Sequence, residues 1–262
     1  MRIDVLALQR FYGSRLGEAA RRMAARRIGA VWPGAAGQDM LGLGYALPYL
    51  EPYRAEARRV VAFMPGAQGA EAWPGQGKVM SALGDETRLP FMDSLFDRVL
   101  IVHALEEAEA PRALLREIWR VMAPEGRLLI VAANRAGLWA HADATPFGHG
   151  RPFSRPQLAA LLSDSLFEPM ASARALYAPP VDWPLVSALA DGLERAGEIV
   201  MPGFGGLVLM EAVKRLYADV GRVPGKVLLT RAPGRAKPAP GSETRAPDGR
   251  MEYRSGRTGN SP

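Results

Sequence analysis

Short apolar runs alternate with helically spaced apolar residues through the middle of this 262-residue chain, and this alternation restricts the possible folds more than any other feature. Runs of strand length, bounded by turn residues, occur at Asp39–Leu43, Val60–Met64, Val79–Leu83, Arg98–Val102 and Arg127–Ala133. Helical spacing occurs at Leu47–Ala57, Pro111–Val121 and Arg155–Ser163. Buried strands separated by helices predict a doubly wound α/β fold with a mostly parallel sheet and right-handed crossovers.

The two ends of the chain differ in composition from its middle. Helical spacing from Val5 to Val31, with a break near Gly13–Ser14, predicts an N-terminal helical segment within residues 1–36. Residues 37–230 hold the α/β domain, which we expect to continue with a strand near Ala171–Tyr177, a helix near Leu185–Ile199 and a strand from Gly206 to Lys214. Residues 231–262 are rich in Pro, Gly, Ser, Thr and Arg and predict a disordered basic tail, because few apolar groups are present to offset the entropy cost of ordering.

Charge and cysteine content exclude several kinds of protein. The formal net charge is +6, but most of this excess falls in the tail, so it says little about the α/β domain. No segment approaches the ~20 apolar residues that span a bilayer, and the N-terminus lacks an apolar leader, so we expect a cytoplasmic protein with no membrane partner. The absence of cysteine excludes disulfides and thiolate nucleophiles, and with only three histidines no metal site is expected.

A glycine-containing turn follows the first predicted strand, where a parallel sheet binds its ligands. Gly42, Leu43, Gly44, Tyr45 and Ala46 would let the backbone approach a ligand at the start of the next helix, although tight packing is an equal alternative. A nicotinamide-dependent oxidoreductase is disfavoured, because Leu47 stands where the dinucleotide fingerprint needs a small residue and no acid follows the second strand.

Asp85 and Glu86 follow the third predicted strand. A carboxylate in this turn can accept a hydrogen bond from an exocyclic amine such as that of adenine. The alternative is a loop carboxylate that faces water.

Fixed spacings after Asp85 resemble a known family. The matching residues are Asp85-x4-Pro90-Phe91-x-Asp93-x2-Phe96-Asp97-Arg98-Val99-Leu100, then His103-x-Leu105-Glu106, then Leu114-Leu115-Arg116-Glu117-x2-Arg120-Val121-x2-Pro124-x-Gly126-Arg127-Leu128. This pattern is similar to the class I S-adenosylmethionine-dependent methyltransferases, in particular the type 11 group that includes quinone methyltransferases. Over residues 37–134 the resemblance implies a Rossmann-like fold of seven strands with the last one antiparallel, and S-adenosylmethionine as cofactor.

The chain departs from that family at the positions that hold the cofactor. Gly42 stands at the acid of the first motif, Gly44, Ala46 and Pro48 stand at its three glycines, and Met64 replaces the acid that binds the ribose hydroxyls. Loss of that charge-assisted bond weakens binding by roughly 1.5–3 kcal/mol. The resemblance places the cofactor against Gly42, Leu43, Gly44, Tyr45, Ala46, Met64, Asp85, Glu86 and His103, of which Asp85 matches the adenine-contacting position.

Histidines and aromatic residues after the fourth and fifth strands are the candidates for chemistry. Transfer of a methyl group from a sulfonium needs mainly alignment of the acceptor, and a base only where the acceptor must lose a proton. His103 and His149 are the predicted catalytic residues, with a helix cap and a turn in a packed loop as their structural alternatives. Tyr12, Phe147, His149 and Arg151 are the predicted substrate contacts, although Tyr12 would more often belong to the core.

These observations favour a methyltransferase that acts on a small-molecule acceptor. The alternative is a non-catalytic, methyltransferase-like module that binds a protein or RNA through its basic N-terminal helix and tail. Arginines at 21, 22, 26 and 27 form a basic stripe on that helix, but a solvated helix face explains them better, because no aromatic residues are interleaved with them.

Overall fold

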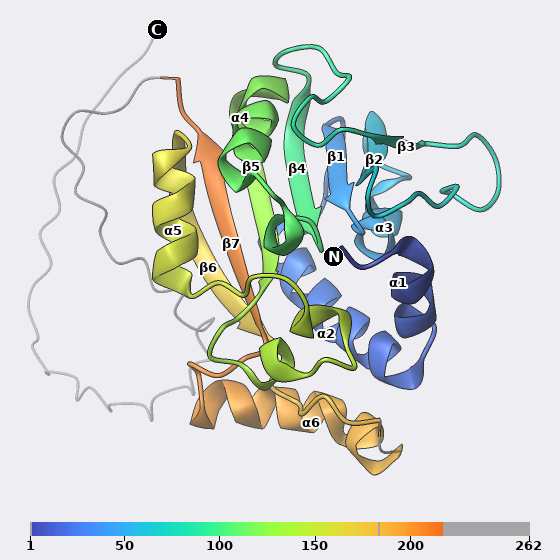
Figure 1. Cartoon of the computed structure of the whole chain (residues 1–262), viewed down its shortest axis with the longest axis vertical. Coiled ribbons are helices and arrows are strands. Elements are labelled where there is room, and N and C mark those ends of the chain that lie inside the picture. Colours follow the sequence, from blue (N-terminus) through green and yellow to red (C-terminus); the bar gives the residue numbers. More distant parts are fainter. Residues whose placement is uncertain (1, 183, 217–262) are drawn as a thin grey trace, which may run out of the picture. The chain divides into compact units, whose positions relative to one another are not determined.

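The computed structural model describes residues 2–182 and 184–216 (Figure 1). The predicted tail, residues 231–262, lies outside the described residues. The boundaries of the three predicted segments therefore remain predictions.

A seven-stranded sheet forms the centre of the fold, in the order β3-β2-β1-β4-β5-β7-β6 (Figure 1). Strands β1 to β5 run parallel to one another, whereas β7 is antiparallel to both β5 and β6. The strands are β1 Asp39–Gly44, β2 Arg59–Pro65, β3 Ser81–Gly84, β4 Phe96–Val102, β5 Met122–Ala133, β6 Phe167–Ala175 and β7 Leu207–Lys214. This topology confirms the predicted fold class, and its order reverses between β1 and β4, where open α/β sheets bind ligands.

Helices cover both faces of the sheet. They are α1 Val5–Tyr12, α2 Arg15–Val31, α3 Leu47–Leu50, α4 Pro111–Val121, α5 Arg155–Asp164 and α6 Pro184–Val200. One hydrophobic cluster joins α1, α2 and α3 to the sheet, and a second joins α4 and α5 to its other face. Within the described residues, no helix is both long and apolar enough to cross a membrane.

Polar side chains cap the first turns of α1, α2 and α5. Asp4 caps α1 by accepting from the Ala7 N–H, and Ser14 caps α2 by accepting from the Gly17 N–H. Ser154 and Gln157 form a reciprocal capping box at the start of α5. These local hydrogen bonds also split the long N-terminal helix at the predicted break.

Two local predictions were wrong in extent. The helix expected over Leu47–Ala57 is a single α-turn, α3, followed by a 3-10 turn over Glu51–Tyr53, because Pro52 has no N–H to continue the helical ladder. Strand β6 begins at Phe167, four residues before the predicted strand, because its ladder with β7 already starts there. The connection between β2 and β3, with glycines at positions 66, 69, 75 and 77, contains no helix.

Candidate active site

A pocket of about 990 Å³ opens at the carboxyl ends of β2, β3 and β4. Its walls come from Pro65–Ala67, Gly84–Thr87, Glu106–Ala110 and Gly150–Arg151, together with Arg2 from the start of the chain. Carboxylates outnumber cations in this lining, since Asp85, Glu86, Glu106, Glu107 and Glu109 face two arginines. We call it the acidic pocket, and its charge favours a cationic ligand.

Asp85 and Glu86 reach this pocket from the turn after β3. The Asp85 carboxylate accepts hydrogen bonds from the Thr87 N–H at 2.8 Å and the Thr87 hydroxyl at 2.7 Å, and these bonds lower the pKa of Asp85. One oxygen of Asp85 makes both bonds, so the other is free to accept from a ligand. Both predicted carboxylates therefore lie where a ligand at this edge would meet them.

The first residues of the chain close one wall of the acidic pocket. Arg2 makes two hydrogen bonds of 2.7 and 2.8 Å to the carboxylate of Glu86 and lies 3.8 Å from Glu107. The Ile3 N–H donates to Glu107, and the Val5 N–H donates to the Gln68 carbonyl at 2.7 Å. Sequence reasoning missed Arg2, because nothing in a sequence pattern places the second residue beside residue 86.

Glu106 is a buried carboxyl at the edge of the same pocket. One of its oxygens accepts from the Ala133 N–H at 2.9 Å, and the other has no hydrogen-bond partner within the described part of the chain. Burial raises the pKa of Glu106 to about 7. Sequence analysis noted Glu106 in the motif after the fourth strand but did not single it out as a site residue. That motif was the one sequence feature that could have indicated it.

The titration of Glu106 should make stability fall as pH rises from 4.5 to about 7. Over that range the folded protein keeps a proton that the unfolded chain has released, so a higher pH favours unfolding. Relative to Glu106→Gln, the wild-type protein should lose up to about 3 kcal/mol of unfolding free energy across this window. Urea unfolding followed by circular dichroism at several pH values measures the difference. The exposed Glu109 offers a control, since Glu109→Gln should keep the wild-type dependence of the unfolding free energy on pH. If Glu106→Gln also keeps that dependence, Glu106 is not its cause.

The glycine turn lies apart from the acidic pocket. Gly42, Leu43, Gly44, Tyr45 and Ala46 are all buried and none of them lines it. A Cβ on Gly42 would lie 2.5 Å from a methyl group of Leu50, so this glycine makes room for α3. Met64, where the resemblance expects an acid, is fully buried in the core.

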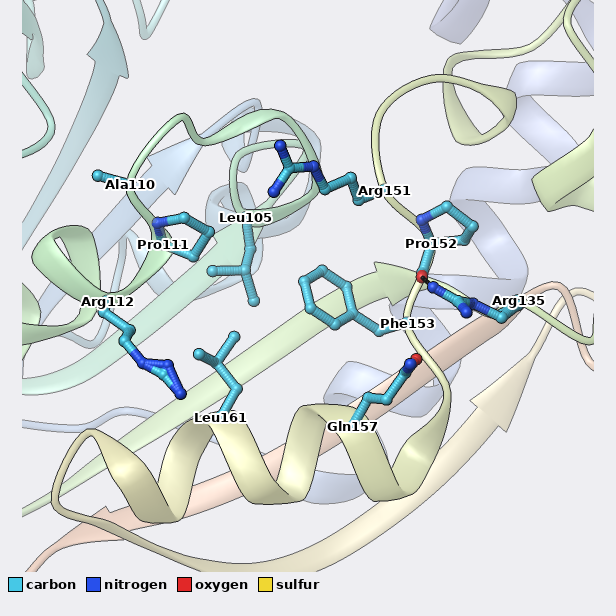
Figure 2. A pocket seen from close by; sticks show the side chains of 10 residues that line it. All are labelled: Leu105, Ala110, Pro111, Arg112, Arg135, Arg151, Pro152, Phe153, Gln157 and Leu161. Atoms are coloured by element: carbon cyan, nitrogen blue, oxygen red, sulfur yellow. Dashed lines mark hydrogen bonds between the residues drawn. The ribbon is translucent and has the colours of Figure 1, made fainter.

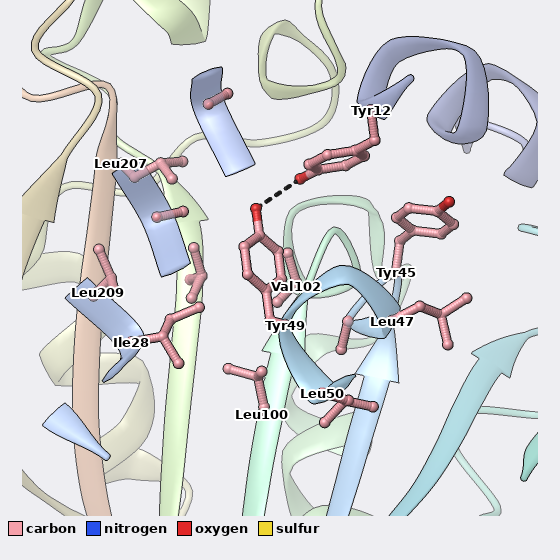
Figure 3. Packing of buried hydrophobic residues seen from close by; sticks show 14 of the residues in the cluster. Tyr12, Ile28, Tyr45, Leu47, Tyr49, Leu50, Leu100, Val102, Leu207 and Leu209 are labelled. Atoms are coloured by element: carbon pink, nitrogen blue, oxygen red, sulfur yellow. Dashed lines mark hydrogen bonds between the residues drawn. The ribbon is translucent and has the colours of Figure 1, made fainter. Parts of the chain in front are cut away.

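Aromatic side chains fill the space above the glycine turn (Figure 3). The ring of Tyr12, from α1, stacks on the ring of Tyr45 with their centroids 5.5 Å apart. The hydroxyl of Tyr12 forms hydrogen bonds with the hydroxyl of Tyr49 at 3.1 Å and with Nε2 of His103 at 2.8 Å. Gln68 covers His103 from another side by donating to its carbonyl at 2.8 Å. We call this arrangement of Tyr12, Tyr45, Tyr49 and His103 the aromatic plug.

His103 is part of this plug. Its side chain is buried, and burial lowers its pKa to about 3, so the ring is neutral at physiological pH. The alternative that His103 caps the following helix was wrong. The 3-10 turn Leu105–Glu107 has Ala104 as its N-cap residue, and no side chain caps it.

The loop after β5 separates the other predicted acceptor residues. Phe147 is buried with its ring centroid 4.6 Å from that of His103, so it belongs to the plug. His149 is exposed, with Nε2 3.0 Å from the Asp143 carbonyl oxygen. Arg151 alone among these residues lines the acidic pocket.

Comparison with known proteins agrees with this architecture. A family model described as a methyltransferase domain matches residues 41–130. A demethylmenaquinone methyltransferase of Mycolicibacterium paratuberculosis is 32% identical over 177 residues, which cover 67% of this chain and 73% of that protein. Its counterpart in Mycobacterium tuberculosis is 36% identical over 121 residues, 46% of this chain and 49% of that protein. The chain thus spans about half the length of several of the curated relatives it matches.

Solved structures share the fold. An S-adenosylmethionine-dependent methyltransferase of Thermotoga maritima, described as a possible histamine N-methyltransferase, superposes with a TM-score of 0.59 at 16% identity, over 79% of this chain and 94% of that one. An S-adenosylmethionine-dependent methyltransferase of Mesorhizobium loti superposes with a TM-score of 0.51 at 16% identity, over 78% of this chain and 99% of that one.

The strand order, with its single antiparallel strand and a pocket at the carboxyl edge, defines a Rossmann-like domain of the methyltransferase type. The chain belongs to the family of class I S-adenosylmethionine-dependent methyltransferases.

Proposed function

We propose that this protein is an S-adenosylmethionine-dependent methyltransferase that acts on a small-molecule acceptor. The observation that carries the proposal is the acidic pocket, with Asp85 at the family's adenine-contacting position. The adenosine half of the cofactor offers an exocyclic amine and ribose hydroxyls, from which these carboxylates can accept hydrogen bonds. When bound, the cofactor would supply an activated methyl group.

The residues present fit one half of the cofactor better than the other. Asp85, Glu86 and the backbone of Pro65–Ala67 would hold the adenosine half in the acidic pocket. The methionine half would need the space above the glycine turn, which the rings of Tyr12 and Tyr45 occupy. Binding of the whole cofactor therefore requires the Tyr12 ring to leave the plug.

The roles of the two histidines remain part of this proposal. A neutral His103 can accept a proton only weakly, given its low pKa, so we assign it to positioning of Tyr12 unless the plug opens. His149 is the accessible candidate base on the loop after β5. The mycobacterial relatives are named for demethylmenaquinone, which supports a quinone as the class of acceptor to test first.

Calorimetric titration of S-adenosylhomocysteine into the full chain tests the proposal. We expect saturable binding that Asp85→Asn weakens about tenfold, because a hydrogen bond to a charged group is worth about 1.5 kcal/mol or more. Asp93→Asn is the matched control, since this exposed aspartate lies outside the acidic pocket and should leave the affinity unchanged. Absence of binding at millimolar ligand would reject the enzyme assignment.

The plug also favours a second candidate, a methyltransferase-like module without catalysis. Met64 in place of an acid and Tyr12 over the glycine turn both weaken cofactor binding. Under this alternative the titration shows no heat, and binding to RNA or protein through α2 becomes the measurement to make. Salt-sensitive binding of RNA would then identify the partner class.

A further inference from the structure

A second pocket, of about 490 Å³, lies beside the acidic pocket between the start of α4, the helix α5 and the segment 151–153 (Figure 2). Leu105, Pro111, Phe153 and Leu161 line it with hydrocarbon, and the ring of Phe153 points into its centre (Figure 2). Its volume is within the range of small-molecule sites.

The charged groups of this second pocket are all of one sign. Arg112, Arg135 and Arg151 line it, and no Asp or Glu does. Arg112 pairs with Asp164 at 2.6 Å, whereas the Arg135 guanidinium donates to the Pro152 carbonyl at 3.4 Å. Among residues 2–182 and 184–216, the Arg151 guanidinium has no hydrogen-bond or ion-pair partner. We call this site the arginine pocket.

The start of α4 adds to the positive potential. Its N-cap residue, Ala110, offers no side-chain cap, so the first-turn N–H groups keep their partial positive charge beside Arg112. Figure 2 shows Arg112 and Arg151 on opposite sides of the opening, with Leu105 and Pro111 between them. An apolar floor under an arginine rim suits a molecule with a hydrocarbon body and an anionic head.

We propose that the arginine pocket binds an apolar carboxylic acid. Its carboxylate lies between Arg112 and Arg151, and its hydrocarbon body packs on Leu105, Phe153 and Leu161. Ala110 and Arg151 line both pockets, so this acid lies next to the acidic pocket. Its role as the methyl acceptor rests on the proposed function, whereas its binding does not.

The two pockets thus differ in charge: carboxylates dominate the acidic pocket, whereas the arginine pocket suits an anionic ligand. Among the residues that line the arginine pocket, sequence analysis singled out only Arg151.

The experiment uses 4-phenylbutyrate as the probe and its neutral counterpart, 4-phenylbutan-1-ol, as the comparison. Calorimetry on the full chain should show saturable binding of the acid and at least tenfold weaker binding of the alcohol. Arg112→Gln, which changes the arginine pocket but not the acidic one, should weaken the acid about tenfold. Arg116→Gln removes another exposed arginine of α4 that does not line the pocket, and should leave the affinity unchanged.

Equal affinity for acid and alcohol, or equal losses in the two arginine variants, would overturn the proposal. Titration of S-adenosylhomocysteine into Arg112→Gln distinguishes the failure of this proposal from the failure of the proposed function. Cofactor affinity should be unchanged in this variant, because Arg112 does not line the acidic pocket. In the wild-type protein, cofactor binding without binding of the acid rejects the arginine pocket alone. Arginine-dependent binding of the acid without cofactor binding supports the pocket and rejects the enzyme assignment.

Discussion

Replacement of Gly44 by alanine should lower the free energy of unfolding by about 3 kcal/mol or more. Gly44 has φ +77°, in the left-handed region that costs an alanine about 1–2 kcal/mol. A Cβ there would also lie 2.2 Å from the Val102 carbonyl oxygen and 2.8 Å from the Ala104 Cβ, so β1 and the end of β4 would have to separate. Urea unfolding followed by circular dichroism measures the loss.

Gly37 provides a matched control for the close approach. It has a similar φ of +69°, but a Cβ there would meet nothing within 4 Å. Gly37→Ala should therefore cost only the backbone strain, about 1–2 kcal/mol. Equal losses in the two variants would show that the contact with β4 is not what requires glycine at position 44. A larger loss at Gly44 assigns this glycine to the packing of the sheet.

Acid should destabilise the protein through His103, by up to about 5 kcal/mol between pH 6.5 and about 3. In this window the unfolded chain takes up a proton at the imidazole that the buried ring in the folded protein does not accept, so a lower pH favours unfolding. The contribution opposes that of Glu106, whose proton favours the folded protein as pH falls. The effects of Glu106 and His103 on the unfolding free energy therefore partly cancel between pH 4.5 and 6.5. Below pH 4.5 the effect of His103 dominates.

The variant His103→Asn isolates this effect. Asparagine tolerates the φ of +51° at this position better than other non-glycine residues do, and it does not titrate. The difference in unfolding free energy between wild type and variant should shift in favour of the variant as pH falls below 6.5. His141→Asn removes an exposed histidine and should keep the wild-type slope. A wild-type slope in His103→Asn would show that the buried imidazole does not cause the acid sensitivity.

Most of the fold could be predicted from the sequence, because the signals are local. Short continuous apolar runs and helically spaced apolar residues act within a few residues, so the order of strands and helices followed from the chain itself. The antiparallel last strand came from the family resemblance. The helix after β1 was overestimated, because apolar spacing outweighed the missing N–H of Pro52.

The candidate site was predictable only in part. Asp85 and Glu86 follow a strand end, and the carboxyl ends of parallel strands share one edge, so their place could be foreseen. The glycine turn was read with equal weight as a ligand contact or as packing, and the structure shows it packed against Leu50 and the end of β4. Spacing alone does not reveal what lies above a turn.

By itself, the sequence determined the alternation of elements, the sheet edge at which Asp85 and Glu86 lie and the departures from the family's acids. Each of these depends on residue type and on neighbouring residues. Only the tertiary structure decided that Tyr12 covers the turn, that Glu106 and His103 have opposite pKa shifts, and that arginines from α4 and two loop segments line one pocket. These outcomes depend on burial and on contacts between residues far apart in the chain. Desolvation and packing act through space, which a local sequence pattern does not encode.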